Sequence, residues 1–234
     1  MRVICALFAI LFLFSGFLFS LPIGINSTSI SAGTPVTLGD QTAGTVSAWG
    51  GNITRVNLTI NSSTLHWQGF YGTISGTLTL AGGNSTLRLW NASNITGQIY
   101  VSRDSNVNFT GINATSANLS QVDSAFSFLG GASDSAPNTG TDSANSAFSI
   151  GQYRVYANTY PKILTRNSTG SSVWEQVVLR HSTDGDSEDF VFVGLVNSSG
   201  VAYNGDSAHF QLIVPEDAAG DASATTYYFY GELQ

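Results

Sequence analysis

Short segments of this chain alternate apolar and polar residues, and this period of two constrains the fold more than any other feature of the sequence. In residues 53–60, the even-numbered positions from Val56 onward are apolar and the positions between them are polar. Side chains alternate across a β-strand, so a segment of this kind can bury one face and leave the other in water. We therefore expect a strand over residues 53–60.

Similar segments recur along the chain. Residues 74–80, 95–101 and 107–110 alternate in the same way. Residues 190–196 are apolar on both faces, which predicts a strand covered from both sides. Further strands rich in β-branched and aromatic residues are expected at 153–156, 173–180, 209–214 and 225–230. About ten or more short strands between Gly, Asn, Asp and Pro turns indicate an all-β chain of antiparallel sheets, arranged as a β-sandwich or jelly roll.

The N-terminus has the features of a secretory signal. Arg2 precedes an apolar run over residues 3–19, and Pro22 follows it. A positive start, a compact apolar stretch and a helix breaker are typical of a signal peptide. We assign residues 1–24 to an apolar signal helix that is removed on export. Retention as an anchor is the alternative, although a run of this length is marginal for spanning a bilayer.

Residues 25–234 are expected to form one β-sandwich domain. The only Cys, Cys5, lies in the signal segment, so the exported chain contains no disulfide. Roughly 210 residues can bury enough apolar surface to fold without one. A Ser/Ala/Gly-rich stretch at about 114–149 is predicted as an insertion, with one short helix inside residues 118–129, where apolar residues follow a helical spacing.

The charge of the chain argues against two classes of partner. Only 10% of residues are charged, and 8 Lys+Arg against 15 Asp+Glu give a formal charge of −7. Such a surface repels nucleic acid and anionic membranes. We therefore expect no nucleic acid as a partner, and contact with a membrane only through the N-terminal segment if it is retained.

Asn-X-Ser/Thr sequons are more frequent than chance predicts. If roughly a quarter of the Asn residues were followed by Ser or Thr two positions later by chance, about four or five sequons should arise. Each sequon marks a surface position for an N-linked glycan if the chain is exported. Asn57, Asn61, Asn94 and Asn108 also lie opposite an apolar row, as glycan-bearing strands with one wet face require. The twelve predicted sites are Asn26, Asn52, Asn57, Asn61, Asn84, Asn91, Asn94, Asn108, Asn113, Asn118, Asn167 and Asn197.

The sequence offers little catalytic chemistry. His66, His181 and His209 are not spaced as metal ligands, and the exported chain has no Cys nucleophile. In residues 72–76, Ser stands one position away from its place in the G-x-S-x-G motif of a nucleophile elbow. The residues lie inside an alternating segment, and we interpret them as structural. We expect no enzymatic activity and no cofactor.

One acidic cluster is a candidate calcium site. Asp184, Asp186 and Glu188 could place several oxygens around Ca²⁺, which prefers hard oxygen ligands. The segment lacks the Gly and the terminal Glu of an EF-hand loop. A solvated acidic turn between strands explains the same residues, so we assign no metal site.

Two parts of the chain resemble a group of uncharacterised archaeal secreted proteins. The first part is residues 65–80, containing Trp67–Gly72 (WQGFYG), with residues 97–102 downstream. The second is residues 210–217, ending in VPED, followed by residues 226–233, containing YYFYGEL. Members of the group often carry Cys residues in the middle region, which this chain lacks. The resemblance implies an archaeal surface or extracellular setting with abundant Asn glycosylation, and it implies no activity.

Two classes of function fit these observations. A structural subunit of an extracellular glycosylated filament, sheath or surface coat is favoured by the low charge and by aromatic C-terminal strands beyond the last sequon, Asn197. Such a subunit would form a homo-oligomer or polymer, and residues 25–38 could pair with a neighbour's sheet edge. The alternative is an adhesin or carbohydrate-binding sandwich that uses exposed Trp49, Trp67 or Trp90. A pilin is a weaker fit, because the processing site before its helix is missing.

Overall fold

The computed structural model describes most of the chain beyond its N-terminal segment. The described residues are 21–25, 30, 32–34, 36, 45–82, 85–91, 97–112, 117–128, 130–216 and 225–232. Residues 1–20 of the predicted signal helix lie outside them, and its last two residues, Ile23 and Gly24, form a short strand instead. Within the described ranges, no helix is long and apolar enough to cross a membrane.

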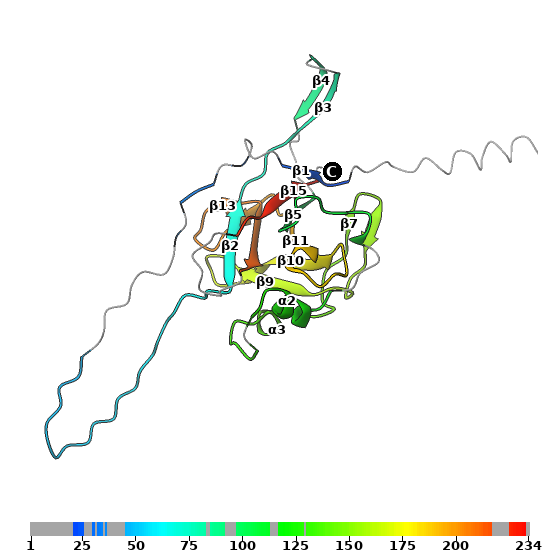
Figure 1. The fold of residues 1–234 in the computed structure, drawn as a ribbon. Helices are drawn as coiled ribbons and strands as arrows, with labels where there is room; N and C mark the ends of the chain where they lie inside the picture. The colour runs from blue at the N-terminus through cyan, green and yellow to red at the C-terminus, as the bar shows by residue number, and fades with distance from the viewer. Residues whose placement is uncertain are drawn as a thin grey trace, which may run out of the picture.

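A seven-stranded antiparallel sheet forms the centre of the molecule (Figure 1). β10 and β11 lie at its middle and pair over five residues, with Val178 opposite Phe192. Strands far apart in sequence therefore meet here, since β5 and β15 continue the sheet on one side and β9 on the other. In spatial order the strands are β1 (Ile23–Gly24), β15 (Tyr228–Gly231), β5 (Gln98–Ser102), β11 (Phe190–Leu195), β10 (Ser172–Arg180), β9 (Lys162–Arg166) and β6 (Gly140–Thr141).

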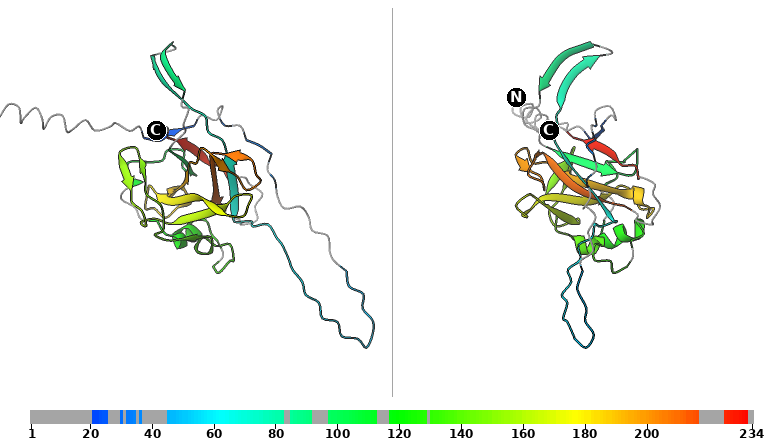
Figure 2. Two further views of the ribbon diagram at one scale, coloured as in Figure 1. Left: turned by 180° about the vertical axis from the view of Figure 1, so that it is seen from behind. Right: turned by 90° about the vertical axis from the view of Figure 1, so that its left-hand side faces the viewer.

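The other described strands form antiparallel pairs. The β14–β2 pair packs against the central sheet, with β14 in contact with β10 and β11. The β3–β4 hairpin projects away from the body of the molecule (Figure 2). The pairs are β14 (Phe210–Pro215) with β2 (Trp67–Gly72), β3 (Thr77–Gly82) with β4 (Ser85–Asn91), β7 (Phe148–Ile150) with β8 (Tyr153–Val155), and β12 (Gly200–Val201) with β13 (Ser207–Ala208).

The predicted strands in the second half of the chain are confirmed. Those expected at 153–156, 173–180, 190–196, 209–214 and 225–230 appear as β8, β10, β11, β14 and β15. The chain is mostly β, with antiparallel pairing and few helices, as the alternation predicts. Helical turns are short: α2 (Leu119–Ala125), α3 (Ala136–Thr139) and the 3₁₀ turn η4 (Ser187–Asp189).

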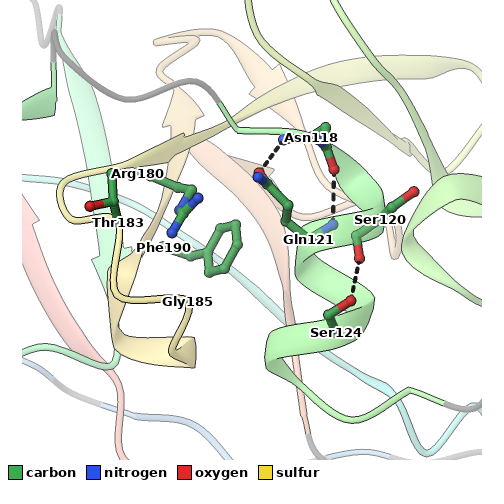
Figure 3. Close-up of a pocket in the computed structure, with 8 residues that line it drawn as sticks. All are labelled: Asn118, Ser120, Gln121, Ser124, Arg180, Thr183, Gly185 and Phe190. Atoms are coloured by element: carbon green, nitrogen blue, oxygen red, sulfur yellow. Dashed lines mark hydrogen bonds between the residues drawn. The ribbon is translucent and has the colours of Figure 1, made fainter.

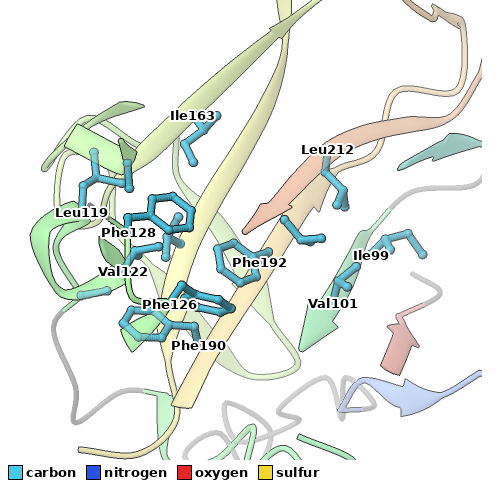
Figure 4. Packing of buried hydrophobic residues seen from close by; sticks show 14 residues of the cluster. Ile99, Val101, Leu119, Val122, Phe126, Phe128, Ile163, Phe190, Phe192 and Leu212 are labelled. Carbon is cyan, nitrogen blue, oxygen red and sulfur yellow. The ribbon is translucent and has the colours of Figure 1, made fainter. Parts of the chain in front are cut away.

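Apolar residues are buried on both faces of the central sheet. β11 shows this best, because Phe190 and Phe192 join one core cluster while Val191 and Val193 join another. Its two faces are therefore both covered, as predicted. The first cluster also holds Leu212 of β14 and residues of α2 (Figure 4). The second contains Tyr100, Phe109, Ile150, Val177 and Tyr230, among others.

The helix predicted within residues 118–129 is confirmed as α2. Asn118 caps it, because its Oδ1 accepts the backbone N–H of Gln121, and the Gln121 side chain accepts the N–H of Asn118 in return. Such a reciprocal capping box satisfies two N–H groups that the first helical turn leaves unpaired. Leu119 and Val122 are buried on the helix face that meets the sheet. This part of the predicted insertion therefore supplies core residues.

A buried glutamine joins the β14–β2 pair to the central sheet. Gln176 of β10 is fully buried; its Nε2 donates to the carbonyl of Ile213 at 2.7 Å, and its Oε1 accepts the N–H of Ile213 at 2.8 Å. Close packing accompanies this link, since a Cβ added at Gly194 of β11 would lie only 3.0 Å from Leu212. The side chain of Gln176 thus takes the place of a neighbouring strand for the backbone of β14.

The strand predicted over residues 53–60 is wrong. The segment is extended but pairs with no described strand, and Leu58 and Ile60 are 80% and 86% exposed. The alternation is real, yet a strand forms only where a neighbour accepts its hydrogen bonds. Residues 45–65, which we call the arm, run away from the body (Figure 1).

Two other early predictions are corrected. Residues 107–110 form no strand: Val107 and Phe109 are buried as expected, but Asn108 Oδ1 accepts the N–H groups of Thr110 and Gly111 and turns the chain. Asn side chains favour such turns over strand pairing. β3 begins at Thr77, so the strand predicted from residue 74 starts three residues late.

The link between the layers is testable by substitution. Gln176→Ala should lower the free energy of unfolding by about 2 kcal/mol, because it leaves the N–H and the carbonyl of the partly buried Ile213 without these partners. Gln152→Ala, at an exposed position, is the control and should change stability by less than about 0.5 kcal/mol. Urea unfolding of both variants gives the comparison. Equal stability of the two would contradict the role of Gln176.

Candidate functional site

Most of the predicted glycosylation sites that the structure describes are at the surface. Asn167 is half-buried, and the side chain of Asn91 in β4 is not described. Asn26, Asn84, Asn94 and Asn113 lie outside the described residues. The exposed sites are Asn52, Asn57, Asn61, Asn108, Asn118 and Asn197.

Three of the sequons share a local geometry. At Asn108, Asn167 and Asn197, the side-chain oxygen of Asn accepts the N–H of the residue two positions on and also the hydroxyl of that Ser or Thr. The Thr110 hydroxyl lies 2.6 Å from Asn108 Oδ1, and the Thr169 hydroxyl lies 2.8 Å from Asn167 Oδ1. Both donors bind Oδ1, so the amide nitrogen that would carry a sugar is not used in these hydrogen bonds.

The prediction that some of these Asn residues lie on the polar face of strands is only partly met. Asn57 and Asn61 are exposed but belong to the arm, and Asn108 lies in a turn, so none of the three stands on the wet face of a strand. Exposure is confirmed for them, and the strand that was expected to present them is not. Asn94 lies outside the described residues.

Asn118 combines a sequon with a structural role. Its Oδ1 is used by the helix cap, and attachment of a glycan at Nδ2 would leave that oxygen able to accept. An open pocket of about 460 Å³ adjoins it (Figure 3), lined by polar side chains of α2 and by the 180–190 segment. The guanidinium of Arg180 is held by Asp189 at 2.8 Å. The pocket therefore presents hydroxyls and amides beside an already paired charge.

The acidic segment near this pocket is organised around Asp189. Burial alone would raise the pKa of Asp189, but hydrogen bonds from Arg180 and from the N–H of Gly185 hold it below its ordinary value. The predicted calcium ligands Asp184, Asp186 and Glu188 are exposed. Among the described residues, no three His, Cys, Asp or Glu side chains gather as metal ligands, these three included.

Sequence reasoning missed a polar cluster where the arm meets the body. His66 Nδ1 lies 2.8 Å from Asp134 Oδ1, and the hydroxyl of Thr64 donates to the other carboxylate oxygen. Trp67 Nε1 donates to the backbone carbonyl of Asp134 at 2.6 Å, and Phe128 stacks on the His66 ring at 4.4 Å. We call Thr64, His66, Trp67 and Asp134 the arm anchor. No motif marks it, because its halves are 68 residues apart.

The carboxylate of Asp134 holds this anchor together. The Thr64 hydroxyl lowers the pKa of Asp134, and His66 adds to that effect, against the opposing influence of partial burial. The anchor is therefore strongest where Asp134 is ionised.

The other two histidines make different contacts. For His209, Nδ1 lies 3.0 Å from both the backbone nitrogen and the carbonyl oxygen of Ile74. His181 Nε2 lies 3.3 Å from an Asp104 oxygen.

The tryptophans whose side chains the structure describes do not form the exposed row that a sugar-binding face would need. Trp49 is 73% exposed on the arm, Trp67 is half-buried in the arm anchor, and Trp174 is buried with Nε1 donating to Val201. The side chain of Trp90 is not described. Trp49 is thus the single exposed Trp among the side chains that the structure describes.

The aromatic C-terminal strand is part of the core. β15 pairs with β1 on one side and β5 on the other, so both of its backbone edges are used. Tyr230 is buried in the second cluster, Phe229 packs against the first, and Tyr228 is 41% exposed. The stretches that carry the archaeal resemblance meet here, because β2 pairs with β14 and Phe70 contacts Phe229 at 5.4 Å.

Comparison with known proteins gives no identification. No protein-family model matches the chain, and neither a curated protein nor a solved structure is significantly similar to it.

The arm anchor should depend on pH. The folded pKa of Asp134 is lowered, so its stabilising contribution is complete above about pH 4 and is lost as pH falls through the folded pKa. Asp134→Asn should cost about 1 kcal/mol at pH 7, a value reduced by solvent exposure, and progressively less as pH falls through the folded pKa. Urea unfolding over this range of pH is the measurement. Asp186→Asn, which alters an exposed carboxylate outside the arm anchor, is the control.

The exposed sequon turns should carry glycans that the fold does not need. Asn197→Gln should remove one glycan mass from the secreted chain and shift the melting temperature by less than about 2 °C, because the side chain is exposed. Intact-mass spectrometry and thermal unfolding test the two parts. An unchanged mass would show that Asn197 is unmodified.

Proposed function

We propose that this chain is a structural subunit of an extracellular glycosylated filament, sheath or cell-surface coat, and that it assembles as a homopolymer. The arm is the observation that carries this proposal. A monomer rarely leaves a contiguous row of large apolar side chains in water, and such surfaces mark sites of association. The arm exposes Val46, Trp49, Ile53, Val56, Leu58, Ile60 and Leu65.

The body of the molecule suits the same role. We propose that the central sheet and the β14–β2 pair form a β-sandwich, supported by the core cluster that they share and by the Gln176–Ile213 link. Antiparallel sheets with free edge strands associate readily by edge-to-edge pairing. The edge strand β6 is only two residues long, whereas β2 is six residues long and offers a longer template.

Glycosylation and secretion complete the proposal. The exposed sequons support attachment of N-linked glycans, and the N-terminal apolar segment supports export to the cell surface. The resemblance to archaeal secreted proteins supports the same location. We propose no enzymatic activity and no cofactor, because the described polar clusters have structural partners: Arg180 with Asp189, and His66 with Asp134.

Electron microscopy of material released from the producing cells tests this function. We expect regular filaments, tubes or sheets that contain this chain, because the arm can bury its apolar row only against another surface. Mass spectrometry of the same particles identifies the subunit. Dispersed monomers that adhere to carbohydrate surfaces would contradict the structural role and favour the adhesin alternative.

A further inference from the structure

One edge of β2 pairs with no described strand. The residues of β2 that bond β14 alternate with residues whose N–H and C=O groups point away. The N–H of Glu216 donates to the carbonyl of His66 at 2.8 Å, which places Gln68, Phe70 and Gly72 on the bonded side in the β14–β2 register. Gly69 and Tyr71 therefore direct their backbone groups outward, where the Gly69 carbonyl accepts the side chain of Gln68 at 2.8 Å. Within the described residues, no strand pairs with this side.

The core is incompletely covered beside this open edge. Phe70 of β2 meets Phe229 of β15 edge to face at 5.4 Å, so the space next to β2 lies over β15 and β1. Ile25, Ile74 and Phe229 are only partly buried while packing against the first core cluster. A strand added outside β2 would cover these side chains with its inner face.

The arm has the composition of the missing strand. Val56, Leu58 and Ile60 share one face and are 47%, 80% and 86% exposed. The opposite face carries Asn57 and Asn61, which are sequon residues. Paired with β2, the segment would bury its apolar face on the core and hold both Asn residues in solvent.

The arm anchor directs this segment away from its own body. Thr64, His66 and Trp67 are all bound to Asp134 at the start of β2, and the arm runs obliquely away from the body from there (Figure 1). Folding back onto β2 of the same chain would require a reversal within the residues that the anchor holds. About eight residues of extended strand reach roughly 26 Å, enough to cross a neighbouring subunit's edge.

We propose that residues 53–60 of one copy add as a strand to the open edge of β2 in a second copy. This inference rests on the proposed structural function and names its contact. Each subunit then donates one arm and accepts one, which generates a head-to-tail contact that extends into a polymer.

Substitution of the inner face tests the donor segment. Val56→Asp/Ile60→Asp in the full chain should raise the concentration needed for assembly at least about a hundredfold, because both carboxylates would be buried against the core. The matched control is Arg55→Asp, which changes the outward face next to Val56. Neither variant alters a sequon. Equal assembly of the two variants, followed by light scattering, would overturn the proposal.

Substitution of the acceptor edge gives a complementary test. Gly69→Pro removes an outward N–H and preserves the bonds between β2 and β14, as proline on an edge strand allows. This variant should not polymerise alone. The Gly69→Pro variant keeps an intact arm, and the Val56→Asp/Ile60→Asp variant keeps an intact β2 edge. A mixture of the two should therefore give one-to-one dimers, measured by size-exclusion chromatography with light scattering. A mixture of monomers only would contradict the pairing.

A peptide of residues 52–61 separates this inference from the function on which it rests. Added to Val56→Asp/Ile60→Asp, it should slow amide hydrogen exchange at Gly69 and Tyr71 by at least about tenfold, whether or not the wild-type chain polymerises. If the wild type polymerises and the peptide protects neither amide, the donor and edge are wrong while the structural function stands. If the peptide binds and the wild type remains monomeric under all conditions, the contact stands and the polymeric function fails.

Discussion

The arrangement of this protein depends on how the backbone groups at the two edges of the β14–β2 pair are satisfied. At the β14 edge, the amide of Gln176 replaces a strand by donating to and accepting from Ile213. This contact joins the pair to the central sheet and closes that side of the core. At the β2 edge, no described strand forms hydrogen bonds with the outward backbone groups. The β14 edge of this pair is therefore closed by Gln176, whereas the β2 edge pairs with no described strand.

The sequence predicted strands best where the same chain covers them. Residues 190–196 were apolar on both faces, and β11 is buried on both faces because two clusters of this chain pack against it. Residues 53–60 alternate clearly but form no strand, since a period of two predicts that one face will be buried without identifying the surface that covers it. Within the described part of the chain, the apolar face of this segment meets no neighbouring strand, and we propose that a second copy provides one.

In the candidate sites, some contacts join residues close in sequence and others join residues far apart, and only the first kind could be predicted. The sequon turns at Asn167 and Asn197 were predictable, because the hydroxyl that binds each Asn oxygen lies two residues away. The contact of His66 with Asp134 and the contact of Gln176 with Ile213 were not, because each joins residues far apart in sequence that no motif connects. Only the fold brings their halves together.

In the proposed contact, glycans on Asn57 and Asn61 would give the open edge a selectivity that backbone pairing lacks. An unpaired strand edge accepts any extended segment, and a slip of one residue in register exchanges the two faces of the incoming strand. For residues 53–60, such a slip would turn Asn57 and Asn61 toward the core and leave Leu58 in water. A bulky sugar on either Asn would oppose that register, because it would have to be buried between the added strand and the core. In the proposed contact, the sequons of the arm would therefore restrict strand addition to the face that buries the apolar row.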